Sequence, residues 1–372
     1  MMNSDKAKIL LADGTIIEGD SFGAQLDENN LPIISFAEIV FNTSMVGYQE
    51  ILTDPSYASQ AVVMTYPEIG NYGINDDDFE NDKGIFLKGI IVKSYCKSES
   101  HYKSKKSLSK YLKENNIIGI ENIDTRNLTK KIASIGSMPC VLTTGEITDD
   151  IKQQLADFVF PEDVVKQVSV KDIKRIKGDG ANIALIDLGC KKSIINEFKK
   201  RKCNLTIYPY NISSGELLSK GYDAIFLSNG PGDPQDVKET INTVKELIGK
   251  IPIYGICLGY QILSIALGAS TYKLKFGHRG ANHPIMNLET DKVIMSSQNH
   301  SYAVDKENLP KGFIPTYINL NDGTLEGFKN VDLKIDAVQF HPEAACGPCD
   351  AKSIFDSWVD KIKEDKKLCQ KN

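Results

Sequence analysis

From residue 181 onward, short apolar runs alternate with amphipathic segments, and this alternation constrains the fold more than any other feature of the chain. The runs NIALIDLG, LTIYPY, DAIFLSNG and IPIYGI have the length of strands, and the segments between them have the charge pattern of helices. Strands that alternate with helices form βαβ units, whose parallel sheet is covered by helices on both faces. Residues 181–372 are therefore expected to form a doubly wound α/β domain, with its ligand site at the carboxyl ends of the strands.

The first 150 residues lack this regular alternation and indicate a separate, β-rich α/β domain. In AKILLADGTIIEG, Asp13 and Gly14 stand between two apolar runs, as in a hairpin turn. Residues 151–180 carry many charges and end in Lys-Gly-Asp-Gly, so we predict the domain linker there. The predicted organisation is an N-terminal domain at 1–150, a linker at 151–180 and a C-terminal domain at 181–372.

The composition argues against several classes of function. A formal net charge of −5 gives no electrostatic basis for binding nucleic acid or a membrane surface. No apolar run approaches the roughly 20 residues that span a bilayer, and the N-terminus lacks the long apolar core of a signal peptide. The eight cysteines are scattered and form no disulfide framework. We therefore expect a cytoplasmic protein with reduced thiols and with neither a nucleic-acid nor a membrane partner.

One cysteine stands where a nucleophile would be expected. The apolar strand IPIYGI runs into Gly255-Ile256-Cys257-Leu258-Gly259, and a helix follows. A nucleophile between two such glycines, on a strand-to-helix turn, is typical of a nucleophile elbow. At a helix N-terminus the dipole favours the thiolate, and the N–H of Leu258 can face a developing oxyanion. The alternative is a buried structural cysteine, which this context makes the less favoured interpretation.

A thiol nucleophile needs a base, and His341 is the candidate among five histidines. It follows the apolar run DAVQF and begins the triplet His341-Pro342-Glu343. Residues two apart in extended backbone face the same side, so Glu343 can orient the imidazole ring. Without the elbow, a surface turn would be the simpler explanation of this triplet.

A third element is the loop Asn229-Gly230-Pro231-Gly232-Asp233-Pro234, which follows the strand AIFL. Its two glycines let backbone N–H groups face a ligand, as the second donor of an oxyanion hole requires. An ordinary Gly-Pro turn is the alternative. The loop is not a phosphate-binding P-loop, because the Lys-Ser/Thr pair is missing.

Taken together, GICLGYQ, NGPGDP and HPE, in this order, resemble the class I (triad) glutamine amidotransferases. Cys257 and His341 are 84 residues apart, as in that family. The resemblance implies that Cys257 attacks the glutamine amide, that His341 is the general base and acid, and that Glu343 orients it. It also implies that the backbone N–H groups of Gly232 and Leu258 hold the oxyanion.

The rest of the chain resembles the carbamoyl-phosphate synthase small subunits. The matching segments, which together extend over nearly the whole chain, are 41–57, 65–71, 124–129, 275–284 and 297–300. The resemblance implies an N-terminal domain peculiar to this subunit and a C-terminal class I glutaminase domain. It implies a glutamine pocket that comprises Ser44, Gly230, Gly232, Leu258, Gln261, Asn299, Ser301 and Tyr302.

The same resemblance implies a division of labour between two chains. A large subunit would make carbamoyl phosphate from bicarbonate, two ATP and the ammonia released here from L-glutamine. ATP and magnesium would bind that subunit, so no cofactor and no metal are expected in this chain. The assembly would be a heterodimer, or an oligomer of heterodimers, with an internal channel for ammonia. Whether the product serves arginine or pyrimidine synthesis is left open.

Three features depart from the family pattern. Tyr260 stands where the family often has His, and Ser301 stands where it has Gly. The third is the run Cys346-Gly347-Pro348-Cys349, which imitates a thioredoxin motif but lies outside the βαβ context of that motif. We interpret it as two thiols in a Gly-Pro turn. His278 and His283 could form a metal pair, but no carboxylate or Cys cluster joins them, so we favour a local structural role.

Three rival functions are weighed against this interpretation. A glutaminase that serves another acceptor, as in anthranilate, aminodeoxychorismate or GMP synthesis, would usually lack the N-terminal domain. A non-catalytic scaffold that activates its partner would be expected to have lost Cys257, His341 or Glu343. A free-standing thiol hydrolase would purify without any partner.

Overall fold

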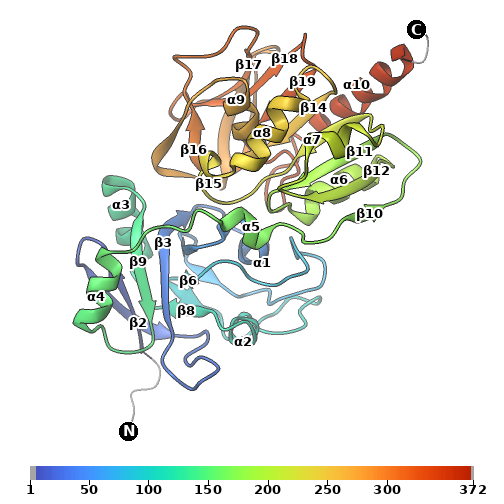
Figure 1. Ribbon diagram of the computed structural model, residues 1–372. Coiled ribbons are helices and arrows are strands. Elements are labelled where there is room, and N and C mark those ends of the chain that lie inside the picture. Colours follow the sequence, from blue (N-terminus) through green and yellow to red (C-terminus); the bar gives the residue numbers. More distant parts are fainter. Residues whose placement is uncertain (1–5, 370–372) are drawn as a thin grey trace. The chain divides into compact units, whose positions relative to one another are not determined.

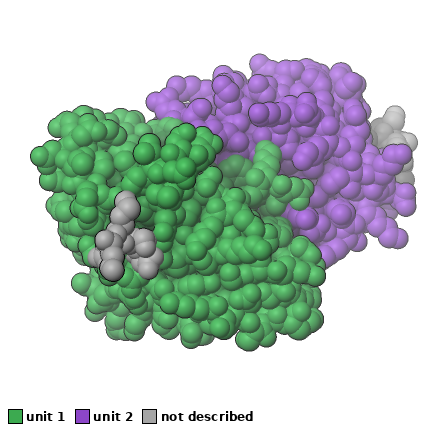
Figure 2. Space-filling model, turned by 90° about the horizontal axis from the view of Figure 1, so that it is seen from below, with its two compact units in different colours: residues 1–161 green, residues 162–372 purple. Residues whose placement is uncertain are grey.

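The computed structural model describes residues 6–369 and divides the chain into two compact units, residues 1–161 and 162–372 (Figure 2). The division falls inside segment 151–180, where the sequence analysis placed the linker. That segment contains regular secondary structure. It contains most of α4 (Asp149–Ala156), together with α5 (Val164–Val168) and β10 (Lys174–Ile176).

Unit 1 is built on a sheet that closes on itself in the order β1-β2-β8-β6-β4-β3-β9. Its strands are β1 (Lys6–Leu11), β2 (Ile16–Ser21), β3 (Ile34–Asn42), β4 (Gln60–Met64), β6 (Gly89–Ile91), β8 (Ile118–Glu121) and β9 (Met138–Thr143). β1 and β2 form the hairpin expected around Asp13 and Gly14, and β1 also pairs with β9 to close the sheet. The β-rich character was predicted, whereas the closure depends on pairing between distant segments.

Shorter elements surround this sheet (Figure 1). They are α1 (Tyr48–Thr53), η1 (Pro55–Tyr57), β5 (Glu68–Ile69), β7 (Ser94–Tyr95), α2 (Leu108–Glu114) and α3 (Thr125–Ile135). Polar side chains cap the helices as the sequence allows: Ser107 accepts from the N–H of Lys110, and Asp124 accepts from that of Asn127.

Unit 2 contains one sheet in the order β10-β12-β11-β13-β14-β19-β18-β17-β15-β16. The strands not yet bounded are β11 (Asn182–Asp187), β12 (Asn204–Pro209), β13 (Ala224–Leu227), β14 (Ile253–Ile256), β15 (Thr271–Asn287), β16 (Lys292–Val304), β17 (Ile314–Asn319), β18 (Leu325–Asn330) and β19 (Ile335–Val338). From β12 to β19 neighbouring strands are parallel, and from β19 to β16 they are antiparallel. The predicted parallel sheet is confirmed, with an antiparallel extension.

Helices cover the parallel strands on both faces, as a doubly wound fold requires (Figure 1). The helices of this unit are α5, α6 (Lys192–Lys200), α7 (Ser214–Leu218), η2 (Pro234–Asp236), α8 (Lys238–Leu247), α9 (Leu258–Ala266) and α10 (Ser353–Cys369). Side chains of β11 alternate between two cores: Ala184 and Ile186 pack with α7, α8 and α9, while Ile183 and Leu185 pack with α6 and α10. None of the described helices is both long enough and apolar enough to span a lipid bilayer.

The approach of α9 to the sheet depends on two glycines beside Cys257. A Cβ on Gly259 would lie 2.3 Å from the backbone oxygen of Leu227 in β13, and one on Gly255 would lie 2.8 Å from the backbone of Gly259. Both distances are shorter than atoms tolerate, so neither position admits a side chain without movement of the backbone. The helix that begins after Cys257 therefore starts directly against β13.

We predict that Gly259→Ala destabilises unit 2. The added methyl must displace backbone rather than a flexible side chain, and overpacking of this kind lowers the unfolding midpoint by roughly 2 to 10 °C. Gly215→Ala in α7 is the matched control, because a Cβ there meets no atom within 4 Å. Thermal unfolding followed by circular dichroism should show a lower midpoint for the first variant only. Equal midpoints for the two variants would contradict the close-packing argument.

Candidate active site

Cys257 occupies a strained turn between β14 and α9. Its backbone has φ 55° and ψ −106°, a conformation that residues other than glycine rarely adopt. The turn is held in place because the N–H of Cys257 donates to the carbonyl of Val338 at 2.9 Å, across the neighbouring strand β19. The predicted nucleophile elbow is therefore present, at the carboxyl end of a central parallel strand.

The thiol of Cys257 is buried, with 2% of the residue exposed. Its Sγ lies 3.5 Å from the backbone oxygen of Asn299 on β16, to which the thiol donates. The antiparallel extension of the sheet thus contributes a wall to the site, beside the parallel strands that supply the nucleophile.

His341 and Glu343 follow β19 and form the predicted pair. The His341 Nδ1 atom lies 2.6 Å from Glu343 Oε1, and the backbone N–H of His341 donates to the carbonyl of Ser297 at 2.9 Å. The opposite ring nitrogen, Nε2, is buried and makes no hydrogen bond among the described residues. That nitrogen is free to exchange a proton with Cys257, whose thiol is close enough to influence the ring.

A buried lysine completes this group. Lys191 follows β11, and its Nζ atom lies 3.0 Å from Glu343 Oε1, 3.1 Å from the carbonyl of Ala344 and 3.0 Å from that of Ala345. Lys191, His341 and Glu343 are each at most 4% exposed. Buried charges are tolerated only when they are paired and hydrogen-bonded, and the ammonium group here has three oxygen partners.

The mutual attraction of these charges shifts the pKa values of both His341 and Glu343. Burial lowers the pKa of His341, but the Glu343 carboxylate and the Cys257 thiol outweigh burial and raise it to about 10. Burial raises the pKa of Glu343, but Lys191 and His341 outweigh burial and lower it to about 2. At neutral pH two cations therefore face one carboxylate in this buried group.

The residues predicted to bind an oxyanion lie at the same edge of the sheet. Leu258 is the first residue of α9, so its N–H has no acceptor within the helix. Gly232 has φ 88°, which glycine alone adopts freely, and a Cβ on Gly230 would lie 2.2 Å from the Leu188 backbone oxygen. The loop therefore requires glycine at both positions.

Three further predicted pocket residues of unit 2, Gln261, Ser301 and Tyr302, already form hydrogen bonds within the chain. The amide nitrogen of Gln261 donates to the carbonyl of Tyr302 at 2.8 Å and to Gln339 Oε1 at 2.9 Å. Only its carbonyl oxygen is left to accept from a ligand. The Oγ atom of Ser301 accepts from the guanidinium group of Arg279.

Ser44 is the predicted pocket residue that belongs to unit 1. It follows β3, is 5% exposed, and its backbone N–H donates to Asn42 Oδ1 at 2.7 Å. Its contribution to a glutamine pocket stays a prediction.

Lys191 is the residue that the sequence analysis missed. The signal was available, because Lys191 comes four residues after the end of β11, and ligand sites in such sheets lie just beyond the strand ends. A strand-end position alone does not show a role for Lys191, because its partner Glu343 is 152 residues away in sequence.

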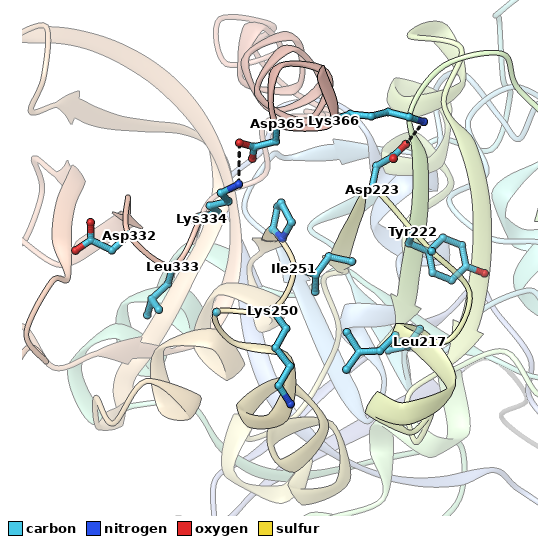
Figure 3. A pocket seen from close by; sticks show the side chains of 14 residues that line it. Leu217, Tyr222, Asp223, Lys250, Ile251, Asp332, Leu333, Lys334, Asp365 and Lys366 are labelled. Atoms are coloured by element: carbon cyan, nitrogen blue, oxygen red, sulfur yellow. Dashed lines mark hydrogen bonds and ion pairs between the residues drawn. The ribbon is translucent and has the colours of Figure 1, made fainter. Parts of the chain in front are cut away.

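A cavity of about 430 Å³ lies elsewhere in unit 2 (Figure 3). Asp223, Pro252 and Lys334 line it, and they immediately precede β13, β14 and β19. The cavity is therefore at the amino ends of the strands, at the edge opposite Cys257. Two ion pairs lie in its lining, since Lys334 meets Asp365 and Lys366 meets Asp223, each at 3.0 Å. This cavity takes no part in the chemistry of the thiol.

Comparison with known proteins agrees with this geometry in both units. Residues 184–361 match the family Glutamine amidotransferase class-I, and residues 9–142 match the family Carbamoyl-phosphate synthase small chain, CPSase domain. The chain is 48% identical to the carbamoyl phosphate synthase small chain of Clostridium acetobutylicum, over 95% of this chain and 99% of that protein.

Two other relatives are similar over the same extent. The carbamoyl phosphate synthase small chain of Archaeoglobus fulgidus is 46% identical, over 96% of this chain and 99% of that protein. The carbamoyl phosphate synthase pyrimidine-specific small chain of Bacillus subtilis is 45% identical, over 98% of this chain and 99% of that protein.

The pKa of His341 leads to a prediction about stability and pH. Its folded value, about 10, lies above the ordinary value of 6.5. The stabilisation due to the protonated ring is therefore fully present below pH 6.5 and is lost as the pH rises through about 10. We therefore expect the unfolding midpoint of the native chain to fall relative to that of His341→Gln as the pH is raised from 6 to 10.

The control for this measurement is His101→Gln, which alters an exposed histidine of unit 1. A change of the same size in the His101→Gln midpoint would show that the pH dependence is not specific to the buried ring of His341. The assigned charge state would be contradicted if the midpoint of the native chain, relative to that of His341→Gln, were the same at every pH or were higher at pH 10 than at pH 6.

Proposed function

Because the chain belongs to the family of carbamoyl phosphate synthase small chains, we propose that it hydrolyses L-glutamine at Cys257 and supplies the ammonia to a large synthase subunit. The observation that carries the catalytic part of this proposal is the buried set of Cys257, His341 and Glu343 at the carboxyl edge of the sheet. The set joins a strained nucleophile to a base whose other nitrogen is fixed by a carboxylate.

The first half of the reaction forms a thioester. The proton of the Cys257 thiol passes to His341 Nε2 as the sulfur attacks the carboxamide carbon of glutamine, and the carbonyl oxygen becomes an oxyanion held by the N–H groups of Leu258 and Gly232. The intermediate collapses as the C–N bond breaks, and His341 Nε2 gives a proton to the departing nitrogen. Ammonia leaves, and a glutamyl thioester remains on the sulfur.

The second half restores the thiol. Water enters where ammonia left, His341 Nε2 removes its proton, and the oxygen attacks the thioester carbon. The C–S bond then breaks, glutamate is released, and the proton on the ring returns to the sulfur. One ring nitrogen serves as acid and then as base because Glu343 keeps the other nitrogen protonated and the ring fixed.

Lys191 acts through Glu343 and not on the substrate. Its ammonium group ties the carboxylate to the carbonyls of Ala344 and Ala345, so the segment after the triad is held in one arrangement. We propose that Lys191 is a positioning residue that keeps Glu343 ionised and directed at His341.

The glutamine pocket is proposed to comprise Ser44, Gly230, Gly232, Leu258, Gln261, Asn299, Ser301 and Tyr302. The hydrogen bonds of Gln261 support the use of its carbonyl oxygen as an acceptor for the substrate. At Ser301 the family's glycine is absent, and the hydroxyl is held by Arg279, which keeps this side chain turned to a partner within the chain.

A partner is expected because the relatives are small chains of a synthase. We propose a heterodimer with the large subunit, or an oligomer of heterodimers, in which the large subunit binds ATP and magnesium and uses bicarbonate. We also propose a cytoplasmic location, since the seven cysteines whose side chains are described are free thiols, as is usual in a reducing compartment.

The proposed nucleophile leads to a direct test. Cys257→Ser should lower the rate of glutamine hydrolysis by about a thousandfold or more, because removal of a covalent nucleophile abolishes the main pathway. Glutamate release from the purified chain measures this rate. The control is Cys349→Ser, which alters an exposed thiol and should keep the native rate. Equal loss in both variants, or retention of activity in Cys257→Ser, would contradict the assignment.

Removal of the buried lysine tests the positioning role. Lys191→Met should lower kcat for glutamine hydrolysis by about ten- to a hundredfold with little change in KM, since it misplaces the base without touching the substrate. Lys199→Met is the control, because Lys199 is exposed on the nearby helix α6. A rise in KM with kcat unchanged would instead indicate that Lys191 binds glutamine.

A further inference from the structure

Beside the active site, unit 2 contains a second buried group of ionisable side chains that the proposed reaction does not use. His278 on β15 and His300 on β16 are directly opposite each other in the sheet, and Glu326 lies on β18. These three residues are buried, at 6%, 5% and 0% exposure. One ligand atom from each lies within 4.8 Å of the other two.

Hydrogen bonds on the outer side of each imidazole fix which nitrogen faces inward. His300 Nδ1 lies 2.7 Å from the carbonyl of Tyr302, which can only accept, so this nitrogen carries the proton. Its Nε2 atom is buried and makes no hydrogen bond among the described residues. His278 Nε2 lies 2.8 Å from Asp322 Oδ2, which leaves Nδ1 to face the centre of the group. Imidazoles held from behind by a carboxylate or a carbonyl are typical of metal ligands.

The distances inside the group suit a shared cation better than hydrogen bonds. Glu326 Oε1 is 3.6 Å from His278 Nδ1 and 3.9 Å from His300 Nε2. Both separations exceed the roughly 2.7–3.2 Å of an N–H···O hydrogen bond. Two ligands of a tetrahedral Zn²⁺, each at about 2.0–2.2 Å from the metal, lie roughly 3.3–3.6 Å apart, so the two pairs that include Glu326 need a contraction of only a few tenths of an ångström. The two imidazole nitrogens lie within 4.8 Å of each other and would approach further around the ion.

The surroundings of Glu326 match a ligand carboxylate. Its Oε2 atom accepts from Gln298 at 2.9 Å, and Oε1 accepts from Asn319 at 3.2 Å, so the group is oriented by amides from two other strands. Asn319 also lies 3.5 Å from His278 Nδ1, at the outer limit of a hydrogen bond. Glu326 and Asp322 together supply two negative charges, which balance a divalent cation held by two neutral imidazoles.

We propose that His278 Nδ1, His300 Nε2 and Glu326 Oε1 bind one divalent transition-metal ion of the Zn²⁺ type, with water as the fourth ligand. Two imidazoles and one carboxylate are a ligand set that zinc accepts. The sequence analysis expected no metal and considered His278 as a possible partner of His283. The set proposed here replaces His283 by residues that are distant in sequence and that the sheet brings together.

The proposed ion would support the active site from outside. His300 immediately follows Asn299, whose backbone oxygen accepts from the Cys257 thiol. The carbonyl of Tyr302 accepts from both His300 and Gln261. A metal ion on His300 would therefore fix the strand segment that contacts the nucleophile, while taking no part in the chemistry. The proposal does not depend on the identity of the substrate.

Protons compete with the ion for this site. Burial lowers the pKa of His278, but Asp322 and Glu326 outweigh burial and raise it to about 9. The neighbouring charged or titratable groups include His283, whose ring centre lies 5.3 Å from that of His278, and Arg279, which donates to the carbonyl of Phe276 at 2.9 Å. Tyr260 interacts electrostatically with Glu326, and Tyr272 with Asp322. Binding must therefore be measured directly on chelator-treated protein.

The test is titration of the full chain with Zn²⁺ by isothermal calorimetry after removal of metals. A Cys346→Ser, Cys349→Ser background removes the two neighbouring thiols that could bind zinc elsewhere. We expect one equivalent to bind, and we expect Glu326→Gln and His300→Gln each to weaken binding by about tenfold or more. His101→Gln is the matched control and should bind as the background does.

Two outcomes would overturn the proposal: no stoichiometric binding by the background chain, or binding that Glu326→Gln and His300→Gln leave unchanged. Should these variants fail to fold, zinc-edge X-ray absorption on the unsubstituted chain decides. A first shell of nitrogen and oxygen with imidazole scattering supports the site, whereas sulfur ligands or a shell of water alone contradicts it.

Discussion

The parallel order of β11, β13, β14 and β19 is the constraint on which the rest of the site depends. Parallel strands end at the same edge, so residues that follow each of them meet although they are far apart in sequence. Lys191 comes from the first strand, Gly232 from the second, Cys257 from the third and His341 from the fourth. No single strand contributes the whole of the machinery, which explains why the site exists only in the folded unit.

Electrostatics then determines how these residues behave. A carboxylate, an imidazolium and an ammonium group are buried together, and each would be costly alone. Glu343 is the centre of the group, because it accepts from both Lys191 and His341. The arrangement gives the chain a base with a fixed ring. It also means that loss of Glu343 would leave two buried cations without their shared counterion.

Much of this could be predicted from the sequence, because the signals were local. The strand-to-helix turn at Cys257 is marked by its glycines, and the pairing of His341 with Glu343 follows from a two-residue spacing in extended chain. Both were confirmed as geometry. Lys191 was missed because its role depends on a partner about 150 residues away, and the cluster of His278, His300 and Glu326 was missed for the same reason. The closed sheet of unit 1 likewise depends on the pairing of β1 with β9, which no local pattern reveals.

The most direct test of the central claim is carbamoyl phosphate formation with glutamine as the only nitrogen source. The purified chain would be combined with the large subunit from the same organism, ATP, magnesium and bicarbonate, and compared with a Cys257→Ser complex given either glutamine or free ammonia. The account predicts synthesis from glutamine by the native complex, none by the variant, and restoration of synthesis in the variant by ammonia. Glutamine hydrolysis by the native chain without any carbamoyl phosphate from the complex would contradict the proposed coupling, and synthesis from glutamine by the variant would contradict the role of Cys257.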